Sequence, residues 1–136
     1  MGLSDNNDKK LHTYKVTGSD LAEFDSGVVH HVCSTFALAR EIEWSSRLFV
    51  IDMLKENEEG LGTRLEIEHL SPALEGEVLM IEATLNDRNK NDVFCSITVE
   101  VNGRIIAKAS TVQKIVNKSQ FIENLSRLAN NGEGQE

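Results

Sequence analysis

One long helical pattern followed by an unbroken series of strands limits the folds open to this chain. From about Val32 to Glu56 the apolar residues recur at helical spacing, and the stretch RLFVIDML is apolar on nearly every side. Such a helix is predicted to be buried rather than to lie on a surface. The rest of the chain as far as Asn117 predicts strands rich in Val, Ile, Thr and Leu, at 62–70, 77–87, 92–101 and 104–117.

The remaining elements complete a single domain. LHTYKVT (11–17) predicts a short strand, Asn102-Gly103 a tight hairpin, and residues 119–130 an amphipathic helix. A curved antiparallel sheet wrapped around one central helix satisfies this order, which is the α+β arrangement called the hot-dog fold. We expect a flexible N-terminus (1–10), one domain (11–130) and a flexible tail (131–136). A lone sheet of this kind leaves an edge uncovered, so a homodimer or dimer-based oligomer is expected.

Charge narrows the range of partners. The chain has 136 residues and a net charge of −8, which argues against binding to nucleic acid or an anionic membrane. The segment 101–118 nevertheless carries four basic residues and no acidic one; these are Arg104, Lys108, Lys114 and Lys118. Lysines protecting a strand edge explain the segment equally well as a landing site for an anionic ligand such as the phosphates of a nucleotide carrier.

Cysteine use and the first residues indicate the compartment. Cys33 and Cys95 each lie inside a predicted regular element, which fits a reduced protein better than a disulfide scaffold. MGLSDNNDKK has no apolar run, so no signal peptide is expected, and no segment approaches the length of a membrane span. We therefore expect a cytoplasmic protein.

Three polar residues interrupt the predicted apolar faces. His69 follows Leu65 and Ile67 on one face of the strand TRLEIEHL, Glu43 lies in a small-to-apolar line of the long helix, and Thr35 begins that helix. Each has a structural explanation: a hydrogen-bonded core histidine, an ion pair of Glu43 with Arg40 or Arg47, and an N-cap threonine. Each is also suited to catalysis, because a hydroxyl, a carboxylate and an imidazole between helix and sheet are the groups needed for acyl transfer to water.

Other common sites have no support in the sequence. It contains no CxxC, HExxH, GxSxG, P-loop or GxGxxG, and the adjacent His30 and His31 face different ways. No metal and no cofactor are therefore expected.

The spacing of the polar residues resembles that of hot-dog acyl-CoA thioesterases, most closely the fluoroacetyl-CoA thioesterase family. That family has a Thr at the start of the central helix, a Glu eight residues later, and a Gly-Thr with a His seven residues past the Gly. The stretches STFALAREIEW and GLGTRLEIEHL fit, with Thr35 to Glu43 eight, Trp44 next, and Gly62 to His69 seven. Gly76 follows seven residues later, and the likeness continues more loosely to about Val116.

The resemblance implies a catalytic set and a substrate. Thr35, Glu43 and His69 would hydrolyse a small acyl-CoA thioester, and the backbone of Gly62 would line the thioester carbonyl. Lys108 and Lys114 are candidates for binding the CoA phosphates. Glu43 would act either as nucleophile or as the base for water.

Two departures from the family limit what it implies. The phenylalanine pair that closes over the fluorinated acyl group falls at Ser26 and Val29, with Phe24 nearby but out of place. An arginine of the last strand falls at Gln113. Fluoroacetyl specificity is therefore not expected. A non-catalytic hot-dog module that binds acyl-CoA is the main alternative, and a hot-dog hydratase ranks last because its Asp and His spacing is not apparent.

Overall fold

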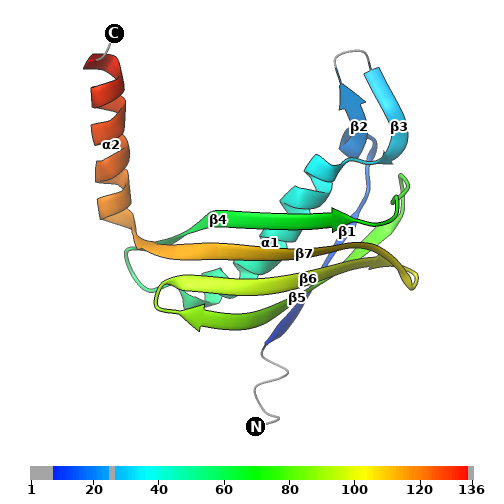
Figure 1. Ribbon diagram of the computed structural model, residues 1–136, viewed down its shortest axis with the longest axis horizontal. Coiled ribbons are helices and arrows are strands. Elements are labelled where there is room, and N and C mark those ends of the chain that lie inside the picture. Colours follow the sequence, from blue (N-terminus) through cyan, green and yellow to red (C-terminus); the bar gives the residue numbers. More distant parts are fainter. Residues whose placement is uncertain (1–7, 25–26, 135–136) are drawn as a thin grey trace.

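The computed structural model describes residues 8–24 and 27–134. Figure 1 shows a long helix, α1, lying across a curved antiparallel sheet, with a second helix, α2, at one corner. The elements are β1 (Lys9–Lys15), a 3-10 turn η2 (Gly18–Asp20), β2 (Leu21–Phe24), β3 (Gly27–Cys33), α1 (Thr35–Met53), β4 (Glu58–His69), β5 (Val78–Asn89), β6 (Asp92–Val101), β7 (Arg104–Asn117) and α2 (Lys118–Gly134).

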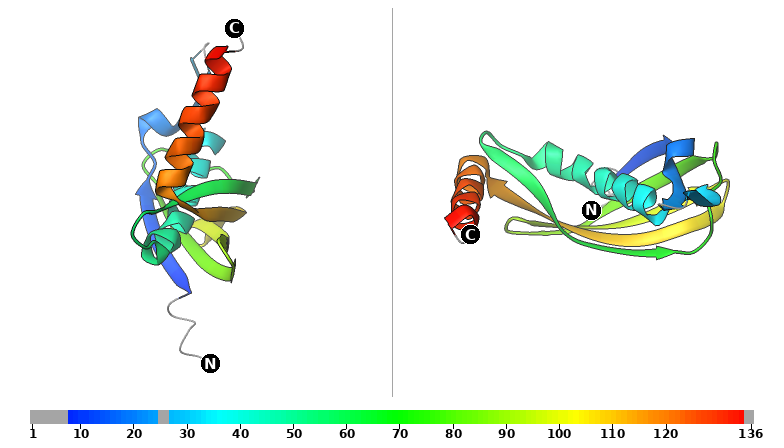
Figure 2. Two further views of the ribbon diagram at one scale, coloured as in Figure 1. Left: turned by 90° about the vertical axis from the view of Figure 1, so that its left-hand side faces the viewer. Right: turned by 90° about the horizontal axis from the view of Figure 1, so that it is seen from above.

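The main sheet has five strands in the order β1-β5-β6-β7-β4, and all neighbours are antiparallel. The view from above in Figure 2 shows the strands curving past one side of α1. This is the predicted α+β arrangement of a sheet around a long helix. The strand β4 forms one edge of the sheet, and β1 forms the other.

The core lies between α1 and the concave face of the sheet. Alternate residues of β6 are buried, as a strand with one face on a core requires. The helix contributes one stripe, whose buried members are Ala37, Leu38, Glu41, Ile42, Ser45, Ser46, Phe49 and Val50. Its other side stays open: Phe36 is 85% exposed and Ile51 is 44% exposed. The prediction that RLFVIDML is buried all round is therefore wrong for the single chain, because the sheet covers only one side of the helix.

Two local predictions are resolved by backbone geometry. The Asn102-Gly103 pair has positive φ at both residues, 48° and 83°, as a two-residue hairpin of this type requires, and it joins β6 to β7. At the start of α1, Ser34 is the N-cap, and its Oγ accepts a hydrogen bond from the Ala37 amide at 3.1 Å.

The segment from Leu21 to Cys33 contains two strands that the sequence pattern does not predict, and the long helix begins at Thr35 rather than near Val32. The two strands form the two-stranded sheet of β2 and β3. The pairing shifts register twice within the four residues of β2. The sequence of this segment therefore shows no regular period-2 alternation of apolar and polar residues. The Ser26 position of the expected phenylalanine pair lies outside the described residues.

The ends of the domain also differ in detail. The strand β1 begins at Lys9, two residues before the predicted start, and α2 extends to Gly134 rather than ending near residue 130. The expectation for residues 1–7 lies outside the described part of the chain. Both cysteines are free and buried, and burial raises the pKa of each thiol to about 11. Among the described helices, none has both the length and the apolar character needed to cross a bilayer.

Candidate active site

Thr35 and His69 form a hydrogen-bonded pair where the start of α1 meets the end of β4. The Thr35 Oγ1 lies 3.1 Å from Nδ1 of His69. Because Ser34 caps the helix, the Thr35 hydroxyl is not needed as an N-cap and is free to contact the imidazole. The N-cap explanation of Thr35 is therefore wrong, and the two residues are neighbours although they are 34 positions apart.

The second ring nitrogen of His69 has no partner. Its Nε2 is buried and is one of three buried side-chain polar atoms without a hydrogen bond among the described residues; the others are Thr111 Oγ1 and Gln113 Oε1. An unpaired buried nitrogen is unfavourable by roughly 1–3 kcal/mol unless a ligand or water meets it. The Thr35 hydroxyl orients the ring through Nδ1, so Nε2 is the atom available to exchange a proton with a bound molecule.

Glu43 and Gly62 form a second contact, between the middle of α1 and the first half of β4. A Cβ atom added to Gly62 would collide with Oε1 of the Glu43 carboxylate. Glycine at this position therefore leaves the space that the carboxylate occupies. The ladder to β7 shifts register between Gly62 and Arg64, so the backbone bends where it meets the carboxylate.

The ion-pair explanation of Glu43 is contradicted by the two arginines on its own helix. Arg40 pairs with Asp20 at 3.1 Å and with Glu41 at 2.7 Å. Arg47 donates to the backbone carbonyl of Gly60 at 2.9 Å. None of the ion pairs found among the described residues includes Glu43, so its carboxylate is available for another role.

Arg40 belongs instead to a polar cluster that joins α1 to the N-terminal elements, and this cluster was not predicted. Asp20 is 2% exposed and accepts hydrogen bonds from the Tyr14 hydroxyl at 2.7 Å and the Thr17 amide at 2.8 Å. Burial of the carboxyl acts to raise the pKa of Asp20, but the hydrogen bonds from Thr17, Tyr14 and Arg40 outweigh it and lower the pKa. Its members are spread over three elements, so no local motif signals it.

The Thr35–His69 and Glu43–Gly62 contacts are separate within one chain. Thr35 and Glu43 are eight residues apart on α1, a rise of about 12 Å. His69 and Gly62 are seven residues apart on β4, a span of about 20 Å. A general acid and a general base must both come within hydrogen-bond reach of the reacting group. The single chain therefore brings the predicted residues together as two pairs rather than as one convergent set.

Gln113 positions the turn of α1 that carries Glu43. It is 1% exposed and is paired in register with Gly62 across β4 and β7. Its Nε2 donates to Ser46 Oγ at 2.8 Å and to the Glu43 carbonyl at 3.2 Å. Gln113 therefore fixes the distance between the helix and the sheet beside the carboxylate.

We expect Gln113→Ala to lower the free energy of unfolding by about 2–4 kcal/mol, because it removes two hydrogen bonds and leaves a cavity. Urea denaturation measures the change. Ser110→Ala, on the exposed face of the same strand, is the matched control and is expected to change stability little. Equal stability of the two variants would contradict the positioning role.

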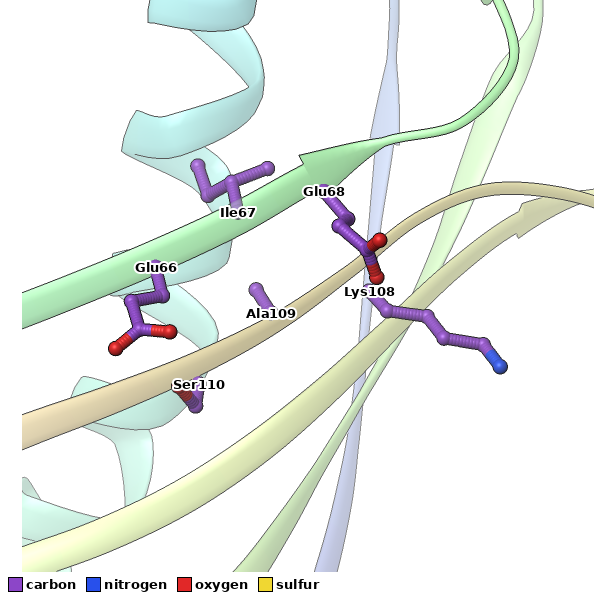
Figure 3. A pocket seen from close by; sticks show the side chains of 6 residues that line it. All are labelled: Glu66, Ile67, Glu68, Lys108, Ala109 and Ser110. Atoms are coloured by element: carbon purple, nitrogen blue, oxygen red, sulfur yellow. The ribbon is translucent and has the colours of Figure 1, made fainter.

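Lys108 and Lys114 lie on the exposed face of β7, while their neighbours Ala107 and Gln113 are buried against the core. Lys108 stands opposite Glu68 of β4 and lines a shallow groove of about 300 Å³ on the outside of the sheet. Figure 3 shows its side chain next to that of Glu68. Lys114 lines a separate polar groove of about 490 Å³ near the start of β4. Within one chain, neither lysine contacts the Thr35–His69 or Glu43–Gly62 pair.

Within the described residues, no three His, Cys, Asp or Glu side chains gather as a metal site would require.

The chain matches a known protein family over most of its length. The family described as fluoroacetyl-CoA-specific thioesterase (FlK) matches residues 16–119. No match was found among curated proteins. Among solved structures, a hypothetical protein of Thermus thermophilus from the thioesterase superfamily has 26% identity and a TM-score of 0.88, over 93% of both chains.

Two more distant structures share the fold. The fluoroacetyl-CoA thioesterase FlK has 14% identity and a TM-score of 0.80, over 88% of this chain and 93% of its own. A hot-dog-like protein of Thermanaerovibrio acidaminovorans has 18% identity and a TM-score of 0.80, over 88% of each chain. Since the family match spans most of the sequence, including Thr35, Glu43, Gly62 and His69, the chain belongs to the fluoroacetyl-CoA-specific thioesterase family of hot-dog proteins.

Proposed function

We propose that this protein hydrolyses a small acyl-CoA thioester to the free acid and CoA. The observation that carries the proposal is the Thr35–His69 hydrogen bond, which orients an imidazole whose Nε2 is buried without a partner. A core histidine with a structural role would have both nitrogens satisfied. Family membership supports thioester hydrolysis as the general activity, and a variant of the FlK enzyme was solved with fluoroacetate and CoA.

The complete site is proposed to form between two copies of the chain. The strand β4 is an edge strand of 12 residues, and such an edge is a template for pairing with another strand. Antiparallel pairing of two β4 edges, centred on Glu66 and with the bulge between Gly62 and Arg64 kept as in the ladder to β7, would set Gly62 of one copy opposite His69 of the other. The Glu43 carboxylate of one copy would then approach the Thr35–His69 pair of the second. Leu65, 39% exposed in the single chain, would be covered at the same seam.

The proposed reaction uses each group once. The backbone amide beside Gly62 and the Thr35 hydroxyl would polarise the thioester carbonyl. A water activated by Glu43 would attack the carbonyl carbon, the C–S bond would break, and protonated His69 would deliver a proton from Nε2 to the leaving CoA thiolate. Transfer to His69 of the proton that Glu43 took from the water would then restore both groups. In the alternative route Glu43 attacks directly, and water then hydrolyses the resulting anhydride to restore the carboxylate. Both routes consume one water and yield one acid and one thiol.

The same β4 pairing would give both Lys108 and Lys114 a role in binding the substrate. Lys108 lies opposite Glu68 and Lys114 opposite Leu61, at the two ends of β4. Pairing of two β4 edges would bring Lys108 of one copy and Lys114 of the other to the same active site, formed by both copies. Their strands, the β7 strands of the two copies, would be separated by the two β4 strands, which is three strand spacings or about 14 Å. Both would lie on the outer face, where the phosphates of CoA are proposed to bind after passing the seam.

We expect charge reversal at Lys108 or Lys114 to raise the KM for acyl-CoA by roughly threefold to tenfold with little change in kcat, because each lysine would act on binding alone. Steady-state kinetics at low ionic strength measure this. Lys15→Glu, on the far edge strand β1, is the matched control. If the KM matched that of the control, the lysines would not bind CoA, and their role would be to protect an exposed strand edge from pairing.

A substrate panel tests the function itself. Purified protein is incubated with acyl-CoAs from acetyl to hexanoyl, including hydroxy, amino and keto variants, and thiol release is followed. Turnover of one subset would establish the thioesterase and identify its acyl class. No release from any member, with acyl-CoA still raising the melting temperature, would instead establish a non-catalytic binding module.

A further inference from the structure

The C-terminal helix α2 is firmly attached at its base and projects from the rest of the molecule. The Lys118 amide donates to the Asn57 carbonyl at 2.8 Å, and Ser119 Oγ donates to Asn57 Oδ1 at 2.9 Å. The Gln120 amide donates to Asn117 Oδ1 at 2.9 Å. Beyond this base, Figures 1 and 2 show α2 extending past the β4 edge of the sheet. It lies almost entirely outside the family match, which ends at residue 119.

The helix carries an apolar stripe that nothing in the described part of the chain covers. Ile122, Leu125 and Leu128 recur at three-residue spacing and are 51%, 48% and 66% exposed. An isolated helix of this length is only marginally stable in water unless its apolar face is packed. The stripe therefore requires a partner surface.

Three exposed apolar residues, which we call the apolar patch, lie near the Thr35–His69 pair at the opposite end of β4. Phe36 follows Thr35, Leu70 follows His69, and Leu74 lies in the next loop, bridged to Val32. These three side chains are 85%, 52% and 49% exposed. An exposed patch beside catalytic candidates indicates a surface that is covered in the working protein.

The order of the strands places the α2 stripe and the apolar patch at opposite ends of β4. The strand β7 ends at Asn117 opposite Glu58, so α2 leaves the sheet at the first residue of β4, whereas the patch lies at its last. Antiparallel pairing of β4 edges places the first residues of one strand beside the last residues of the other. Figure 1 shows α2 extending past this edge, so in a dimer paired through β4 the helix would enter the space of the second copy.

We propose that α2 of one copy packs its stripe onto Phe36, Leu70 and Leu74 of a second copy and forms a wall of that copy's acyl-CoA entrance. This inference rests on the β4 pairing proposed above. The contact is isologous, because each copy supplies one helix and one patch, and it closes at two chains.

Charge and geometry disfavour other occupants of the stripe. The helix carries two basic and two acidic residues, Lys118, Arg127, Glu123 and Glu133, in a chain of net charge −8, so an anionic membrane surface is a poor match. Pairing of α2 with α2 of the same dimer is also disfavoured, since the two helices leave at opposite ends of the seam.

Disulfide trapping tests the contact without reference to activity. Chains carrying Leu125→Cys or Leu128→Cys are mixed with chains carrying Leu70→Cys or Leu74→Cys, allowed to exchange, and oxidised mildly. Native Cys33 and Cys95 are buried, so the introduced thiols react. We expect at least one mixture to give a covalent dimer about tenfold or more above a mixture with Asn130→Cys, because a shared interface raises the effective thiol concentration.

The outcomes separate the alternatives. A covalent dimer formed by Leu125→Cys chains alone would indicate pairing of α2 with itself and overturn the proposal. Mixtures no better than the Asn130→Cys control would also overturn it. Disulfide trapping in a protein that hydrolyses no acyl-CoA would support the α2 contact and contradict the proposed function. Turnover of acyl-CoA without trapping would support the proposed function and overturn the α2 contact.

Discussion

Replacing Glu43 or His69 by alanine is expected to lower kcat/KM by about a hundredfold or more while the protein stays folded. His69 contributes an oriented ring whose Nε2 has no structural partner, and Glu43 takes part in none of the ion pairs found among the described residues. Neither side chain therefore supports the fold strongly. Thiol-release kinetics and thermal unfolding on the same samples measure both quantities. Near-full turnover by either variant would remove that residue from the catalytic set.

Mixing the two inactive variants is expected to restore activity. If each site takes His69 from one copy and Glu43 from the other, a dimer of Glu43→Ala and His69→Ala chains contains one intact site and one doubly altered site. Random exchange makes half of all dimers mixed, so roughly a quarter of wild-type activity should return. If both residues came from one chain, every site would lack either Glu43 or His69, and the mixture would be as inactive as the two variants alone. That result would rule out the composite site.

Gly62→Ala is expected to lower kcat by about a hundredfold with little change in melting temperature. The added methyl group would collide with Oε1 of Glu43, at the flexible end of that side chain. The carboxylate would swing away at small energetic cost, and a misplacement of this size is enough to abolish most catalysis. Alanine also has less backbone entropy than glycine in the unfolded chain, which stabilises the folded state and helps to keep the melting temperature unchanged.

Gly60→Ala is the matched control, two residues earlier on the same strand. Its new methyl group would meet Cγ1 of the buried Val50 at 2.5 Å, inside the core rather than at the carboxylate. Overpacking of this kind destabilises by about 1–3 kcal/mol, so the melting temperature should fall by about 3–6 °C for each kcal/mol while kcat of the folded enzyme is kept. Loss of activity in both variants, or in neither, would contradict the assignment of Gly62 to the catalytic carboxylate.

The sequence determined the elements of this protein that depend on local pattern. The helix pattern, the strands β6 and β7, the hairpin at Asn102-Gly103 and the α+β sheet around one helix all follow from hydrophobic period and turn chemistry, which act over a few residues. The spacing of Thr35, Glu43, Gly62 and His69 also identified the family, because fixed spacing survives when overall identity is low.

Only the tertiary structure decided which polar residues are free to react. Arg40 and Arg47 stand at the right spacing to pair with Glu43, yet one is held by Asp20 and Glu41 and the other by a backbone carbonyl, through contacts between distant elements. The hairpin of β2 and β3 was missed because its register shifts remove the strand period. The predicted site residues form two pairs because α1 packs along β4, so that Thr35 meets His69 at one place and Glu43 meets Gly62 at another. The packing of the two elements decides which of their residues face each other, and no local sequence pattern carries that information.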